Sequence, residues 1–244
     1  MPALLFATLA IDPVPANSAI IGINNPSFEL ADPNSGKPLN WDVAGVVSAG
    51  VQFNIASPPR EGDRAAILTA SPSLRVPREQ LELLLELPAG RLNTLGQGTV
   101  DGGSALAQTV ALPAGKRLVF DFDFGIFNFQ NTQDFALFSI TREFLPGLFF
   151  DEEVFVLADT DSLLTIPPGD RFPETSYRRF VLPITETAIY RIGFAVVNAN
   201  GNQVQSALAV DWVRVVPEPP TFVVLLCGLC MALCSIWRRR GTSA

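Results

Sequence analysis

Acidic side chains are the groups in this sequence best suited to chemistry. There are 24 Asp and Glu residues against 17 Lys and Arg residues, and two Asp-x-Asp pairs stand out, Asp121/Asp123 and Asp159/Asp161. Two facing carboxylates can hydrolyse a glycosidic bond, and carboxylate oxygens are ligands that Ca²⁺ prefers. An Asp-x-Asp pair on a strand more often forms only a polar face, because alternate residues share one side of a strand. Spacing alone places no pair at a catalytic separation.

Histidine is absent from all 244 residues. Its absence removes the commonest general base, the Ser-His-Asp triad and imidazole zinc sites. The three cysteines, Cys227, Cys230 and Cys234, lie in one apolar run near the C-terminus, so the rest of the sequence has no disulfide framework. The net charge of −7 argues against nucleic acid as a partner. We therefore expect no catalytic residues and no required cofactor.

The apolar run from Thr221 to Trp237 holds 17 residues without a charge. A bilayer core of about 30 Å needs roughly 17–25 helical residues, so the run predicts a short transmembrane helix. Prolines precede it and three arginines follow it. By the positive-inside rule the arginines stay cytoplasmic, so the residues before the helix lie outside.

This arrangement resembles the PEP-CTERM sorting signal of Gram-negative bacteria that make exopolysaccharide. A Pro-Glu-Pro triplet, a hydrophobic helix and an arginine cluster occur in that order within segment 216–241. The resemblance implies that an exosortase, a membrane protease or transpeptidase, cuts near the triplet, and that the arginines retain the tail during export. The residues given these roles are Val216, Pro217, Glu218, Pro219, Arg238, Arg239 and Arg240. A precursor anchored in the inner membrane would then yield a protein of the cell surface or extracellular matrix.

The first 19 residues are interpreted as a secretory signal peptide. Residues 2–11 are apolar, and small residues that suit a cleavage site follow them. The basic residues that usually open such a signal are missing, so the signal is interpreted as truncated. The alternative is an ordinary first strand.

Residues 20–215 have the pattern of an all-β sandwich. Short runs of Val, Ile, Phe, Thr and Leu alternate with clusters of Pro, Gly, Asn and Asp. Residues 64–70 and 104–112 are expected to be strands, and residues 118–126 place four apolar side chains on one face and Asp121 and Asp123 on the other. The leucine- and glutamate-rich stretch 77–96 predicts two short helices, near 79–87 and 89–95, although alternating leucines would also suit a strand.

The sandwich also resembles galactose-binding-like, carbohydrate-binding jelly-roll modules. The similarity rests on "NNPSFE" (Asn24 to Glu29), Trp41, "EGDRAA" (Glu61 to Ala66) and "SALAVDWVRVV" (Ser206 to Val216). It implies a jelly roll and a structural Ca²⁺ shared by Glu29 and Asp211, which lie in the opening motif and the last strand.

The same resemblance implies sugar stacking on exposed aromatic rings. The candidates are Phe127, Phe129, Trp41 and Tyr177. Phe127 and Phe129 are out of register with the preceding phenylalanines, which a bulge near Gly125 would explain with both rings buried. In such modules a tryptophan at the position of Trp41 more often anchors the core.

Three classes of function remain open. The first is a non-catalytic surface or matrix protein associated with exopolysaccharide. The second is a dedicated carbohydrate-binding module with a defined glycan, and the third is a glycoside-active enzyme. An exposed aromatic strip with polar neighbours would favour the second class, and a deep cleft with two facing carboxylates the third.

Overall fold

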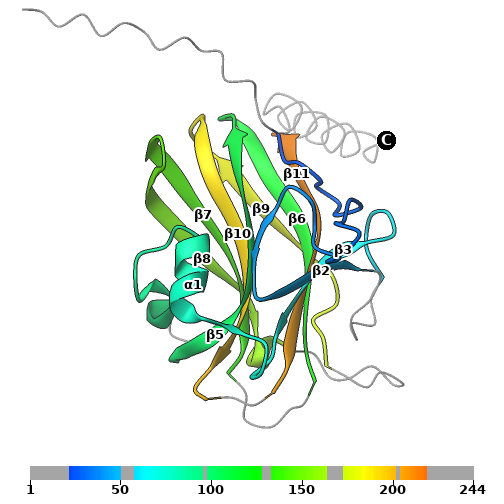
Figure 1. Cartoon of the computed structure of the whole chain (residues 1–244). Helices are drawn as coiled ribbons and strands as arrows, with labels where there is room; N and C mark the ends of the chain where they lie inside the picture. The colour runs from blue at the N-terminus through cyan, green and yellow to red at the C-terminus, as the bar shows by residue number, and fades with distance from the viewer. Residues whose placement is uncertain are drawn as a thin grey trace, which may run out of the picture.

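Two antiparallel sheets make up most of the computed structural model, which describes residues 22–50, 58–95, 98–127, 133–163, 173–201 and 204–218 (Figure 1). The first sheet has the order β1-β5-β10-β7-β8, with β4 also paired to β5: β1 (Asp42–Ala44), β4 (Val76–Pro77), β5 (Val100–Leu112), β7 (Phe135–Leu145), β8 (Leu148–Asp159) and β10 (Ala188–Ala199). The second sheet has the order β2-β3-β11-β6-β9: β2 (Val46–Gly50), β3 (Ala65–Ala70), β6 (Lys116–Ile126), β9 (Arg178–Ile184) and β11 (Ser206–Pro217). The all-β sandwich expected from the sequence is confirmed.

The chain crosses repeatedly between the two sheets. Strands β5, β6 and β7 lie in the first, second and first sheet, and β9, β10 and β11 lie in the second, first and second. Crossings of this kind are typical of double-sheet jelly rolls. They place β11, the last strand, in the centre of the second sheet beside β6.

The main core lies between the sheets and is rich in phenylalanine. Phe120, Phe122, Phe124 and Ile126 all point inward from β6, as the alternation predicts. The Phe120 ring centroid lies 4.8 Å from that of Phe194, and each such ring pair contributes about 0.5–1.5 kcal/mol beyond its buried area. Strand β6 keeps a continuous register with β11 from residue 121 to 126, so the bulge expected at Gly125 is not present.

A short helix and a 3₁₀ turn cover the outer face of the first sheet (Figure 1). They are α1 (Arg78–Leu84) and η1 (Arg91–Leu95), which confirms the two expected helices. Leu81 and Leu85 are fully buried, whereas Leu83 is 74% exposed. Residues four apart share a helix face, so helical packing prevails over the alternation that would have made a strand.

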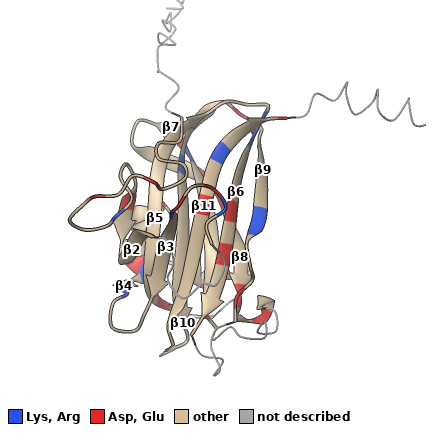
Figure 2. Cartoon of the chain, turned by 90° about the vertical axis from the view of Figure 1, so that its right-hand side faces the viewer, with Lys and Arg blue, Asp and Glu red and all other residues tan. Residues whose placement is uncertain are grey.

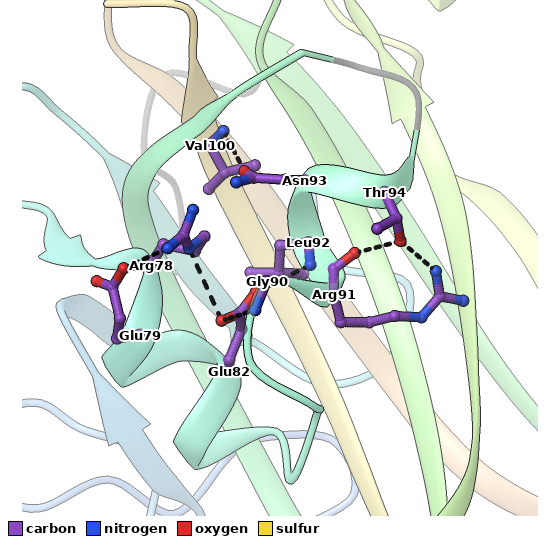
Figure 3. Close-up of polar contacts among 9 residues, drawn as sticks. All are labelled: Arg78, Glu79, Glu82, Gly90, Arg91, Leu92, Asn93, Thr94 and Val100. Atoms are coloured by element: carbon purple, nitrogen blue, oxygen red, sulfur yellow. Dashed lines mark hydrogen bonds and ion pairs between the residues drawn. The ribbon is translucent and has the colours of Figure 1, made fainter.

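Glu82 joins α1 to η1 although it is almost completely buried. Its carboxylate oxygens accept N–H bonds from Gly90 and Leu92, both at 2.9 Å, and its Oε2 lies 3.7 Å from Nε of Arg78 (Figure 3). Buried backbone N–H groups need acceptors, and Glu82 supplies two of them at the start of η1.

The end of β11 includes part of the expected sorting motif. Val216 pairs with Arg117 and Pro217 with Lys116, so the strand continues two residues beyond the boundary expected at 215. Pro217 and Glu218 are exposed. Within the described residues, no helix is long and apolar enough to span a bilayer. Segments 1–19 and 221–237, Pro219 and the arginines at 238–240 lie outside those residues.

Candidate functional site

Three buried carboxylates lie on the outer face of the second sheet. Asp121 and Asp123 belong to β6 and Asp211 to β11, and Asp121 and Asp211 are direct register partners. Each is at most 3% exposed. Figure 2 shows acidic bands on the neighbouring strands β6 and β11 and a basic band on β9 beside them. This outer face, which was expected to be polar, is covered because two loops cross it.

The first covering loop, residues 58–64, is held by the two residues expected to share calcium. The Oδ2 atom of Asp211 accepts N–H bonds from Arg60 at 2.7 Å and from Glu61 at 2.9 Å. The Oε1 atom of Glu29 accepts N–H bonds from Asp63 and Arg64, both at 2.9 Å. Glu29 and Asp211 therefore converge on one loop from positions far apart in the sequence.

The hydrogen bonds that Asp211 accepts come from backbone N–H groups. Asp211 Oδ1 accepts a third N–H bond, from Trp212 at 2.7 Å, so both Asp211 oxygens face donors rather than a shell of oxygens. In the described part of the chain, no group of three or more His, Cys, Asp or Glu residues could hold a metal ion. Burial raises the pKa of Asp211 to about 6, and the N–H bonds from Glu61 and Arg60 oppose that rise. Calcium binding stays a prediction.

The second Asp-x-Asp pair also has a structural role. Asp159 ends β8 and caps η2 (Thr160–Ser162) by accepting N–H and O–H bonds from Ser162 at 2.9 and 2.6 Å. Asp161 is exposed. Asp159 is therefore a turn cap.

The second covering segment is residues 173–177, which lead directly into the edge strand β9. Thr175 donates its N–H to the Phe124 carbonyl at 2.8 Å and its hydroxyl to Asp123 at 3.1 Å. Tyr177 follows and packs partly buried on the small apolar cluster of Ala65, Ile67, Ala207 and Ala209. Burial, then the nearby carboxylates of Asp211 and Asp123, raises the pKa of Tyr177, so its hydroxyl remains a donor at neutral pH.

Cationic groups surround Trp212 on the same face. Arg179 of β9 makes a bidentate salt bridge with its register partner Asp121, with both N–O distances at 2.9 Å. The guanidinium carbons of Arg179 and Arg214 lie 5.0 and 3.1 Å from the Trp212 ring centroid. Burial and the charge of Arg179 lower the pKa of Arg214, whereas the bonds to Asp121 raise that of Arg179.

A β-bulge aims the Trp212 ring at this face. The β11–β6 register shifts between Asp211 and Arg214, and Trp212 has a φ of 55°. A bulky residue with a left-handed backbone is rare, and such strain tends to occur at functional sites. The bulge also moves Val213 into the core.

Two shallow depressions adjoin on this surface. The first, about 380 Å³, is lined by Arg60, Asp121, Tyr177, Arg179 and Trp212. The second, about 320 Å³, is lined by Pro58, Pro59, Arg60, Ser176 and Tyr177. We call the two together the outer-face groove; Arg60 and Tyr177 belong to both parts. Amphipathic rings beside charged hydrogen-bonding groups suit a polar ligand with an apolar face.

The structure separates the four expected aromatic candidates. Tyr177 lies in the outer-face groove. Trp41 is only 6% exposed, packs 5.2 Å from Phe28 between ring centroids, and donates its N–H to the Asn24 carbonyl at 3.1 Å. The expectation that it binds ligand is therefore wrong, because it anchors the core. Phe127 lies on the outer face, partly buried against the cluster beneath Tyr177, and Phe129 lies outside the described residues.

Sequence reasoning missed Arg60, Arg179 and Trp212. One signal for Trp212 was present in "SALAVDWVRVV": the larger aliphatic residues before Asp211 have even numbers, Leu208 and Val210, whereas the first one after it, Val213, has an odd number. Such a change of phase indicates a bulge. The partners of Arg60 and Arg179 come from other strands and loops, so no local pattern marks them.

Comparisons with known proteins give structural likenesses only. No protein-family model and no curated protein matches the chain. The carbohydrate-binding module TmCBM61, solved in complex with β-1,4-galactotriose, has 14% identity and a TM-score of 0.42, and the match covers 81% of this chain and 99% of that one. A family 11 module from Clostridium thermocellum, solved with a mixed-linked tetrasaccharide, has 13% identity, a TM-score of 0.36 and coverage of 81% and 95%.

A glycosidase is also among the solved structures that this chain resembles. The arabinose-bound α-L-arabinofuranosidase MgGH51 has 9% identity and a TM-score of 0.42, and the match covers 81% of this chain but 26% of the enzyme. Scores and identities this low are too loose to transfer a ligand or a site between chains.

Proposed function

We propose that the sandwich is a non-catalytic carbohydrate-binding domain and that the outer-face groove holds the sugar. The observation that carries the proposal is the continuity of two depressions through Arg60 and Tyr177. Volumes of about 380 and 320 Å³ lie at the lower end of the roughly 300–1,000 Å³ usual for small-molecule sites. Two adjoining depressions suit neighbouring units of one glycan chain.

The groups in the groove match the chemistry of a sugar. Guanidinium and phenol groups donate hydrogen bonds to ring hydroxyls, and the rings of Tyr177 and Trp212 offer apolar contact to C–H groups. Both oxygens of Asp121 accept bonds from Arg179, so this carboxylate is a positioning group rather than a general acid. Asp211 is completely buried and cannot touch a ligand. These roles support binding without catalysis.

The proposal includes export to the cell surface or matrix. The sequence supports it through the uncharged run at 221–237, the following arginines and the exposed Pro217 and Glu218 at the end of the last strand. A surface protein with a sugar-binding face would associate with exopolysaccharide. An exosortase and the inner membrane would be its partners before that, and we propose no nucleic-acid partner.

Sugar binding can be tested with two variants that leave the fold intact. Arg60→Ala removes the side chain but keeps the backbone N–H bonded to Asp211, and Tyr177→Phe removes only the hydroxyl. Affinity electrophoresis against a polysaccharide panel, followed by calorimetry on the best ligand, should show each variant binding about tenfold or more weakly, equivalent to about 1.4 kcal/mol.

Arg91→Ala is the matched control, because Arg91 is a half-buried arginine paired with Glu152 on the far side of the first sheet. It should bind like the unmodified chain. If no polysaccharide binds the unmodified chain, or if all three variants lose affinity equally, the outer-face groove is not a sugar site.

Sorting can be tested by intact mass. Protein recovered from its native cells is expected to lack the residues beyond the Pro-Glu-Pro triplet, whereas a variant with Pro217, Glu218 and Pro219 replaced by alanine should keep them. Unmodified protein that still carries Arg238 to Arg240 would contradict exosortase processing.

A further inference from the structure

An exposed apolar hairpin tip lies at one end of the sandwich. Residues 143–150 join β7 to β8, and four side chains there are strongly exposed: Phe144 (70%), Leu145 (54%), Leu148 (46%) and Phe150 (51%). The Phe144 and Phe150 rings contact each other edge to face, 6.2 Å apart between centroids. A strand end that faces only water on its outer side normally carries polar side chains there.

Both faces of the hairpin carry exposed apolar side chains at the tip. Phe144 and Leu145 are consecutive in β7 and so point to opposite sides of the hairpin. A shallow depression of about 340 Å³ lies between residues 143–146 and 187–189, and half-exposed Ile189 extends the apolar surface there. Clustered exposed apolar groups of this kind mark contact with a partner or a membrane.

The same end of the sandwich leads into the C-terminal tail. Pro217 at the end of β11 pairs with Lys116, which also pairs with Ile184 at the end of β9. Strand β10 then starts at Ala188, beside the hairpin tip. Figure 1 shows the β7–β8 turn and the end of β11 at the same end of the molecule.

The distance to the expected membrane span is short. Three residues, Glu218 to Pro220, separate β11 from the uncharged run that begins at Thr221. Fully extended, they reach about 10 Å at roughly 3.3–3.6 Å each. A sandwich tethered so closely to a bilayer presents this end to the lipid surface.

The charges at this end favour apolar over electrostatic contact. Arg142 is paired with Asp151 and Glu186, and Glu143 accepts the N–H of Gly147 at 2.6 Å. Lys116, where β6 begins, pairs with Pro217 and Ile184 rather than with a residue of the hairpin tip. Phenylalanine and leucine at the tip suit the boundary between headgroups and acyl chains.

We infer that the hairpin tip, residues 143–150, inserts into the interfacial layer of the membrane that holds the tail. The inference rests on the membrane-anchored precursor of the proposed function. The tail and the tip together hold the sandwich at two points. The outer-face groove, whose lining lies on the sheet face and not at this end, then remains open to the outside.

The test places an environment-sensitive fluorophore at one engineered cysteine in the full chain. Cys227, Cys230 and Cys234 are replaced by alanine, and the label is attached at Leu145→Cys or, as a control, at Asp161→Cys near the opposite end of β8. The chain is reconstituted into phosphatidylcholine vesicles, and flotation of the protein with the vesicles reports tail insertion separately.

The label at 145 should shift its emission to the blue and be quenched by lipids carrying a shallow quencher, and the label at 161 should show neither effect. Replacing Phe144, Leu148 and Phe150 by serine should abolish most of the shift at 145. A chain that floats with the vesicles but exposes the 145 label to water overturns the inference alone. A chain that does not float overturns membrane anchoring and the inference with it. A shift that follows the protein-to-lipid ratio assigns the tip to a second copy of the chain instead.

Discussion

Replacing Asp211 by alanine should lower the free energy of unfolding by about 3 kcal/mol and release the loop of residues 58–64. The Asp211 carboxylate is fully buried and accepts N–H bonds from Arg60, Glu61 and Trp212. Bonds to a charged group contribute about 1.5–3 kcal/mol each, and hydration of the released loop recovers part of the loss. Urea unfolding gives the change in stability, and limited proteolysis detects cleavage within 58–64.

Glu61→Ala is the matched control, since it removes an exposed carboxylate from the same loop and keeps the N–H that Asp211 binds. Its effect should stay within about 0.5 kcal/mol, as for most surface substitutions. The Asp211 variant should also lose sugar affinity, because Arg60 no longer stays beside Tyr177. Equal stability of the two variants would show that Asp211 does not anchor the loop.

Thermal melting with and without calcium separates loop anchoring from calcium binding. A cation shared by Glu29 and Asp211 would stabilise the native state by about 2.7 kcal/mol at a hundredfold excess over Kd. Because both carboxylates already accept backbone N–H groups, we expect the unmodified chain to melt at the same temperature in excess Ca²⁺ and in chelator. A calcium-dependent rise that disappears in Glu29→Gln would restore the metal site.

Periodic features of the sequence predicted the sandwich well. Alternation in residues 118–126 gave the correct inward face of β6, since side-chain direction in a strand follows from position alone. The stretch 77–96 was ambiguous between helix and strand. Tertiary packing decided it, because Leu81 and Leu85 fit against the first sheet while Leu83 remains outside.

The outer-face groove was much less predictable, for a physical reason. The sequence predicted only a polar face for Asp121 and Asp123, because nothing nearby in the sequence indicates that loops 58–64 and 173–177 cross over them. The sequence made Trp41 a candidate ligand contact. The burial of Trp41 depends on neighbours such as Phe28 and Phe194, which only the fold brings together. The sequence does pair Glu29 with Asp211 through their resemblance to a known module, but it does not reveal that they share a loop.

Replacing Glu82 by alanine should lower the free energy of unfolding by about 3 kcal/mol and loosen α1 and η1, which cover the outer face of the first sheet. Glu82 is 2% exposed, and its loss leaves the buried N–H groups of Gly90 and Leu92 without the acceptor that they have now. An unsatisfied buried donor costs about 1–3 kcal/mol, and two donors are affected. Urea unfolding measures the loss, and faster hydrogen exchange at the Gly90 and Leu92 amides locates it.

Glu82→Gln should fall between the original chain and the alanine variant, because the amide oxygen still accepts one bond while its NH₂ group faces the other donor. Glu79→Ala is the control on the same helix: the Glu79 side chain is 66% exposed and pairs with Arg78 at the surface. That change should have little effect on stability, because exposed ion pairs contribute little. If Glu82→Ala costs no more than Glu79→Ala, helix packing by Leu81 and Leu85 alone holds the cover, and the buried carboxylate contributes nothing to it.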